Sequence, residues 1–129
     1  MSDSVAVIGL GAMGLGMAQS LRRAGFHVRA CDVRSEVAQT FAADGGTACA
    51  TPAEAAAAAD IVVSVVVNAA QTEGVLFGES GAARTMRKGC VFVMCSTVDP
   101  DWSIALEQRL ADLGILYLDA PISGGAAKA

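Results

Sequence analysis

The residues of this chain whose spacing is best suited to chemistry are three glycines near its start. They lie in the run Gly9-Leu10-Gly11-Ala12-Met13-Gly14, which fits the pattern G-x-G-x-x-G. Between a strand and a helix, the first glycine allows a tight turn, the second lets a pyrophosphate approach the backbone, and the third lets helix and strand pack closely. An ordinary glycine-rich turn matches so short a pattern as well. The pattern therefore predicts a dinucleotide-binding loop only if a strand precedes it and a helix follows it.

The flanking segments have this character. Residues 4–9 form a short apolar run that predicts a strand, and apolar residues recur in residues 12–24 at the spacing of one helical face. Gly25 suits a left-handed cap at the end of this helix, and residues 26–31 predict a second strand. The glycine run thus lies between a strand and a helix whose N-terminus would face the phosphates.

Asp32 follows the second predicted strand. A carboxylate at this position accepts hydrogen bonds from the hydroxyls of the adenosine ribose and repels the 2′-phosphate of NADP. Two alternatives remain: Asp32 caps a helix or lies in a solvated turn, and Arg34 attracts a 2′-phosphate. We predict NAD as the cofactor, with NADP the less favoured choice.

The rest of the chain continues the alternation of strands and helices, with six strands expected in all. Helices are expected where caps and apolar periodicity agree, and strands where β-branched runs lack polar alternation. The expected helices are residues 35–44, a helix from Thr51, residues 82–87 and residues 99–113, and the further strands are 61–67, 90–94 and 115–118. This order predicts an α/β fold of the Rossmann type, a doubly wound parallel sheet in three layers. Residues 1–129 are expected to form one dinucleotide-binding domain.

Composition argues against several other classes of protein. The net charge is −4 and the nine basic residues are dispersed, which does not suit nucleic-acid binding. The longest apolar run, residues 61–67, is far short of the roughly 20 residues that span a membrane. The start of the chain lacks the pattern of a signal peptide, so we expect a cytoplasmic protein. The four cysteines lack the close pairing of zinc sites, so we expect no metal and reduced, packed thiols.

Four segments carry a resemblance to a known family: residues 7–14, residues 60–68, Ser96-Thr97, and the run Asp119-Ala120-Pro121-Ile122-Ser123-Gly124-Gly125. With these segments the chain resembles the β-hydroxyacid dehydrogenase family, which includes 3-hydroxyisobutyrate, tartronate-semialdehyde and 6-phosphogluconate dehydrogenases. The resemblance covers the whole chain. It implies an NAD-binding domain that precedes a helical domain used for catalysis and dimerisation.

The resemblance also implies roles for individual residues. It places Val66, Val67 and Asn68 against the cofactor and Thr97 near its nicotinamide end. The predicted cofactor site is therefore Gly9, Leu10, Gly11, Ala12, Met13, Gly14, Asp32, Val66, Val67, Asn68 and Thr97. The resemblance assigns the substrate's carboxylate to Ser123, Gly124 and Gly125, where a hydroxyl and exposed amides would make an anion-binding nest. The alternative for these three residues is an ordinary turn.

Departures from the common family pattern point to one branch. Val67 stands where many relatives have proline, Met94 where many have aspartate, and Lys128 where many have glycine. These departures resemble the L-threonate dehydrogenase branch. They imply a sugar acid such as L-threonate as the substrate, or an acid like 3-hydroxyisobutyrate.

The resemblance places the catalytic lysine on a helix beyond Ala129, so we predict no catalytic residue in this chain. The parent protein is expected to oxidise a β-hydroxy acid by transferring hydride to nicotinamide, and the 129 residues alone are expected to bind without turnover. The resemblance implies a homo-oligomeric parent, and the composition described above predicts no nucleic-acid or membrane partner. Two alternatives are an NADP-dependent semialdehyde or imine reductase and a stand-alone nucleotide-binding module.

Overall fold

The computed structural model describes residues 4–43, 45–66, 68–96 and 98–120. Strands and helices alternate along the chain in the order β1 (Ser4–Ile8), α1 (Ala12–Arg23), β2 (His27–Cys31), α2 (Ser35–Ala43), β3 (Thr47–Ala48), α3 (Pro52–Ala56), β4 (Ile61–Ser64), α4 (Ala69–Phe77), the 3-10 helix η1 (Ala82–Arg84), β5 (Val91–Met94), α5 (Pro100–Ala111) and β6 (Leu116–Asp119).

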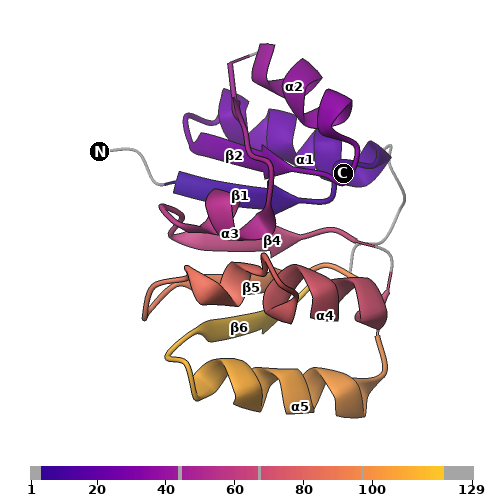
Figure 1. Ribbon diagram of the computed structural model, residues 1–129, viewed down its shortest axis with the longest axis vertical. Helices are drawn as coiled ribbons and strands as arrows, with labels where there is room; N and C mark the ends of the chain where they lie inside the picture. Colours follow the sequence, from indigo (N-terminus) through magenta and orange to yellow (C-terminus); the bar gives the residue numbers. More distant parts are fainter. Residues whose placement is uncertain (1–3, 44, 67, 97, 121–129) are drawn as a thin grey trace.

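The six strands form one sheet in the order β3-β2-β1-β4-β5-β6, and every neighbouring pair is parallel. Figure 1 shows the labelled strands in this order, from β2 near the top to β6 near the bottom. The chain moves outward from β1 to β3, then returns to the other side of β1 as β4. This reversal makes the carboxyl ends of β1 and β4 the topological switch point, where ligands bind in folds of this type. The doubly wound Rossmann-type fold is thus confirmed.

Helices cover both faces of the sheet, which makes three layers. One face carries α1 and α2, and the other carries α3, α4 and α5. Successive residues of β1 point to opposite faces, with Val7 packing toward Phe41 and Ile8 toward Leu76. Because strands at the centre are buried on both faces, they lack the polar alternation of a half-exposed strand. Their carboxyl ends are thereby held in a fixed array.

Several expected elements differ from the structure. Helix α4 was not expected at all, and residues 82–87 form only the short 3-10 helix η1 at their start. The strand expected at 61–67 ends at Ser64, and the sixth strand, which no residues marked, is the two-residue β3. Ser35 is the first residue of α2 instead of its cap. Thr51 does cap α3, since its hydroxyl accepts a hydrogen bond from the Glu54 amide at 3.1 Å.

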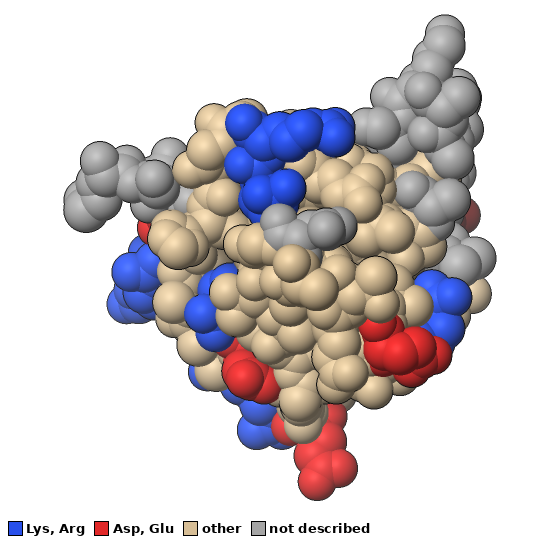
Figure 2. All heavy atoms as spheres, turned by 90° about the horizontal axis from the view of Figure 1, so that it is seen from above, with Lys and Arg blue, Asp and Glu red and all other residues tan. Residues whose placement is uncertain are grey.

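Charged side chains do not gather into one stripe on the face in Figure 2, where small basic and acidic groups surround a largely uncharged surface. In the described part of the chain, every helix is too short or too polar to span a lipid bilayer.

The contact between α1 and the loop after β1 tolerates only glycine at position 14, because a Cβ there would overlap the Gly9 carbonyl oxygen. We expect Gly14→Ala to lower the free energy of unfolding by at least about 2 kcal/mol, since the clash is with backbone. Urea unfolding followed by circular dichroism measures this. Gly74→Ala is the matched control, because its Cβ would meet nothing within 4 Å and alanine favours a helix. Equal stability of the two variants would contradict the packing described here.

Candidate functional site

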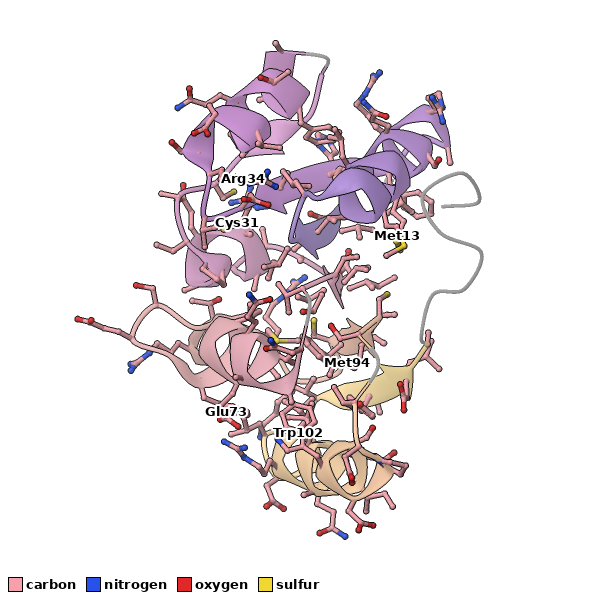
Figure 3. All side chains as sticks on the ribbon, turned by 90° about the vertical axis from the view of Figure 1, so that its right-hand side faces the viewer. Met13, Cys31, Arg34, Glu73, Met94 and Trp102 are labelled. Carbon is pink, nitrogen blue, oxygen red and sulfur yellow. The ribbon has the colours of Figure 1, made fainter. Side chains whose placement is uncertain are left out.

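A cleft of about 580 Å³ opens at the carboxyl ends of β1, β2 and β4. This volume is within the roughly 300–1,000 Å³ of typical small-molecule sites. Figure 3 faces these strand ends and shows Cys31 and Arg34 together at the end of β2. The cleft is lined by Ile8, Gly9, Gly11, Cys31, Asp32, Val33, Arg34, Ala50, Pro52, Val65, Val66, Gln71, Gly74 and Val75.

The three glycines of the loop differ in their surroundings. Gly9 has a φ of +98°, and a Cβ there would lie 2.6 Å from the carbonyl oxygen of Val65. Gly14 packs against the Gly9 carbonyl, so α1 begins close to β1. A Cβ on Gly11 would meet nothing within 4 Å, and this residue faces the cleft. The turn and the packing thus need Gly9 and Gly14, whereas the space beside Gly11 is open for a ligand.

Helix α1 presents its N-terminus at this opening. Its N-cap is Gly11, which has no side chain to cap the first amides, and its first turn carries no acidic residue. The free amides and the positive end of the helix dipole attract an anion. Since this helix end lies beside the open space at Gly11, it suits a phosphate group.

The end of β2 holds the glycine loop by two hydrogen bonds. The Gly9 amide donates to the Cys31 carbonyl at 2.9 Å. The Leu10 amide donates to the Asp32 Oδ2 atom at 2.6 Å. Leu10 itself is buried, so its side chain anchors the loop in the core while its amide faces Asp32. Loop and carboxylate therefore occupy fixed positions relative to each other.

Arg34 pairs with the same carboxylate. Its amide and its Nε atom donate to Asp32 Oδ1 at 2.8 and 3.1 Å. The Asp32 side chain is only 7% exposed, whereas that of Arg34 is 55% exposed. Burial would raise the pKa of Asp32, but the hydrogen bonds from Arg34 and Leu10 and the guanidinium charge outweigh burial and lower it. Asp32 is thus an ionised acceptor at neutral pH, paired with a side chain that solvent reaches.

The Asp32 carboxylate can exchange the Arg34 guanidinium for hydroxyl donors of a ligand. A carboxylate accepts about four hydrogen bonds. If the exposed Arg34 guanidinium moves aside, the two backbone amides remain bound and both carboxylate oxygens gain room for neutral hydroxyl donors. Val33 lies between these residues, lines the cleft and is fully exposed, at 102%. It offers an apolar surface on which a flat ring can pack.

The loop after β4 forms the opposite wall of the cleft. Val66 lines the cleft, and its predicted contact with a cofactor stays a prediction. The Ser96 hydroxyl donates to the Val66 carbonyl, which connects this loop to the one after β5. Asn68 caps α4, since its Oδ1 atom accepts from the Gln71 amide at 2.9 Å. Its predicted contact with a cofactor stays a prediction. Val67 and Thr97 lie outside the described residues.

Helix α4 contributes wall residues that the sequence analysis missed, namely Gln71, Gly74 and Val75. The missed signal was the Asn68 side chain followed by Gln71, which is a capping pattern of the kind that predicts a helix start. Ala50 and Pro52, before and at the start of α3, were missed as well. No motif marks them, because they line the cleft only through the course of the chain.

The predicted substrate-binding residues Ser123, Gly124 and Gly125 lie outside the described residues. The strand that leads to them is anchored at its carboxyl end. The Ser103 Oγ atom lies 2.6 Å from the Tyr117 hydroxyl and donates to Asp119 Oδ2 at 3.2 Å. These contacts attach the end of β6 to α5.

Other candidate groups lie away from the cleft. A smaller hollow of about 230 Å³ at the amino ends of β4 and β5 is lined by Asp60 and Arg87, which pair with each other at 2.9 Å. His27 is exposed at the start of β2, at the opposite end from the cleft. In the part of the chain that the structure describes, no group of three or more metal-ligating side chains occurs. The carboxyl-end cleft is therefore the best supported site.

Comparison with known proteins gives consistent matches. A family described as the NAD binding domain of 6-phosphogluconate dehydrogenase matches residues 4–129. L-threonate dehydrogenase of Cupriavidus necator is 57% identical over 129 residues, which are 100% of this chain and 43% of that protein. Mitochondrial 3-hydroxyisobutyrate dehydrogenase of Mus musculus is 33% identical over 97% of this chain and 37% of that protein. The crystal structure of 3-hydroxyisobutyrate dehydrogenase from Salmonella typhimurium matches with a TM-score of 0.94 and 37% identity, over 99% of this chain and 45% of that one. The chain spans less than half the length of these proteins.

The pairing of Asp32 with Arg34 predicts how this carboxyl titrates. Because its pKa in the folded chain is below the ordinary 3.8, Asp32 stabilises the fold above that pH, and this contribution is lost as the pH falls through the lowered pKa. We expect carboxyl NMR titration to give a midpoint below 3.8 for Asp32, and Arg34→Ala to move it upward. Arg84→Ala, which changes an exposed arginine away from the cleft, should leave it unchanged. A wild-type midpoint at or above 3.8 would refute the pairing.

Proposed function

Because the chain belongs to the family described as the NAD binding domain of 6-phosphogluconate dehydrogenase, we propose that it is the NAD-binding domain of a β-hydroxyacid dehydrogenase. The observation that carries this proposal is the joint position of the glycine loop and Asp32. An uncapped helix N-terminus and a buried, ionised carboxylate are held by the same end of β2. One suits a pyrophosphate and the other a ribose diol, which are neighbouring parts of a dinucleotide.

The described residues fit NAD. The amides of residues 11–14 would bind the pyrophosphate, because Gly11 leaves space for it and has no side chain that competes for these amides. Asp32 would accept the ribose hydroxyls in place of the Arg34 guanidinium, and Val33 would pack on the adenine. Bound NAD supplies the nicotinamide carbon that accepts hydride. Val67, Asn68 and Thr97 complete the proposed cofactor site on the resemblance alone.

We propose NAD over NADP because of charge. A 2′-phosphate would lie against the Asp32 carboxylate, whose pKa is lowered and which is therefore ionised at neutral pH. Arg34 supports some binding of NADP, since its exposed guanidinium could turn from Asp32 to the phosphate. The carboxylate is the more firmly held of the two groups, so we expect it to decide the preference.

For the parent protein we propose a sugar acid substrate of the L-threonate type. Support comes from the 57% identity to a protein named L-threonate dehydrogenase and from the departures at Val67, Met94 and Lys128. The proposed anchor for the substrate's carboxylate is the run Ser123-Gly124-Gly125. We also propose a homo-oligomeric parent in the cytoplasm, where buried free thiols stay reduced.

We propose that these 129 residues bind the cofactor without turning over substrate. The family's proton transfer to or from the reacting oxygen is assigned to a lysine. Of the two lysines in this sequence, Lys88 lines the hollow at the amino ends of the strands, at the opposite end of the strands from the cleft. Lys128 lies outside the described residues and follows the proposed substrate run.

Calorimetric titration with NAD and NADP at matched salt tests the proposal. We expect the wild type to bind NAD more tightly than NADP, and Asp32→Ala to weaken NAD binding by about tenfold or more, which corresponds to roughly 1.4 kcal/mol. Arg34→Ala should weaken NADP binding, because the guanidinium would no longer attract the 2′-phosphate. NAD binding should be kept, because the ribose hydroxyls of NAD replace the guanidinium at Asp32 and do not need it. Asp60→Ala is the control, since this carboxylate lies at the amino end of β4, at the opposite end of the strands from the cleft. Tighter binding of NADP than of NAD to the wild type would overturn the NAD assignment.

A further inference from the structure

Two cysteines face each other beside the cleft. Strands β2 and β3 pair in parallel with Ala30 opposite Ala48, so the next residues, Cys31 and Cys49, are also opposite each other. The Cys49 amide donates to the Ala30 carbonyl at 2.8 Å, which continues the ladder to this position. Both side chains are buried in the same cluster, on the face of the sheet that carries α3 and α4. Register and facing direction thus bring the two thiols together.

The geometry suits a disulfide. Neighbouring strands lie about 4.8 Å apart, and disulfides join residues whose Cα atoms are roughly 4.4–6.8 Å apart. The Cβ atoms in a disulfide lie about 3.8 Å apart, which is closer than the strand spacing, so bonding requires a small movement of the strand ends. The other two cysteines, Cys90 and Cys95, flank the single strand β5 and pack on opposite faces of the sheet. Neither of these two cysteines therefore faces the other as Cys31 and Cys49 do.

Movement at Cys31 would reach the cofactor site directly. The Cys31 carbonyl accepts the hydrogen bond from Gly9, and the next residue, Asp32, accepts the one from Leu10. Cys31 also lines the cleft. A shift of about 1 Å at this strand end would therefore displace both the glycine loop and the carboxylate, and shifts of this size strongly weaken a preorganised site.

We propose that Cys31 and Cys49 are an oxidation site at which a peroxide forms a disulfide that weakens cofactor binding. In the first step the Cys31 sulfur attacks one peroxide oxygen, the O–O bond breaks, and Cys31 becomes a sulfenic acid while water leaves. The Cys49 sulfur then attacks the Cys31 sulfur, the S–O bond breaks, and a second water leaves. Two thiols lose two electrons and two protons, and the peroxide is reduced to two waters. Thiol reductants reverse the change.

The raised pKa values of the Cys31 and Cys49 thiols predict slow oxidation. Burial, with further contributions from Cys49, Asp32 and Glu54, raises the pKa of Cys31 to about 11, and burial also raises the pKa of Cys49. Since the thiolate is the reactive form, the pair stays reduced under mild conditions and reacts under sustained oxidation. A bound dinucleotide would cover the cleft side of Cys31. We therefore expect NAD to slow formation of the disulfide.

The test treats the 129-residue chain with hydrogen peroxide, with and without NAD, and maps disulfides by non-reducing peptide mass spectrometry. We expect a linked Cys31–Cys49 peptide pair, slower to form with NAD present, and NAD affinity at least about tenfold lower than in the reduced chain. Dithiothreitol should restore the affinity. After the same peroxide exposure as the wild type, Cys49→Ala should form no such link and lose less NAD affinity, whereas Cys95→Ala should behave as the wild type does.

The effect on affinity rests on the proposed function, but the disulfide does not. A fully oxidised chain without the Cys31–Cys49 link, or with the link and unchanged NAD affinity, overturns this inference and leaves the proposed function standing. Failure of the reduced wild type to bind NAD refutes the proposed function. The peptide map then still decides whether the pair forms a disulfide.

Discussion

The hydrogen bond from the Leu10 amide to the Asp32 carboxylate is the contact on which the site depends. It joins the loop after β1 to the end of β2 at a donor–acceptor distance of 2.6 Å. The parallel hydrogen bond from Gly9 to Cys31 gives the same connection through the backbone. Together they hold the loop that begins α1 and the carboxylate in one frame. A flexible loop would have to be ordered by the ligand at an entropic cost, whereas this one is ordered beforehand.

The fold makes this frame possible. Because β1 lies between β2 and β4 in the sheet, the loop after β1 can contact the ends of both neighbours. The Gly9 amide donates to the Cys31 carbonyl on one side, and on the other side the Val65 carbonyl leaves no room for a side chain at that turn. The buried carboxylate is kept ionised by two backbone amides and by Arg34, so its charge can act on a ligand. The positions of Gly9, Leu10 and Asp32 are thus fixed together by packing, backbone geometry and electrostatics.

The sequence predicted what depends on local rules. The three glycines and Asp32 were found because a turn and a strand end need particular residues at fixed spacing, and the parallel sheet followed from the alternation of elements. Helix α4 was missed because its apolar periodicity is weak, it contains Gly74, and its cap at Asn68 follows a strand expected to run further. Residues such as Pro52 line the cleft through tertiary structure alone. The facing of Cys31 and Cys49 depends on the pairing of the two-residue strand β3, which periodicity cannot reveal.

The most direct test of the account is an amide and arginine side-chain NMR titration of the chain with NAD. If the end of β2 and the glycine loop form the dinucleotide site, the largest shift changes will be at the amides of Leu10 and residues 11–14, and the Arg34 Nε–H signal will move as the guanidinium leaves Asp32. The chemical shifts of the amides around Asp60 and Arg87, at the amino ends of the strands, will stay unchanged. Shift changes concentrated at the amino ends of the strands, with the glycine loop and Arg34 unaffected, would contradict the account.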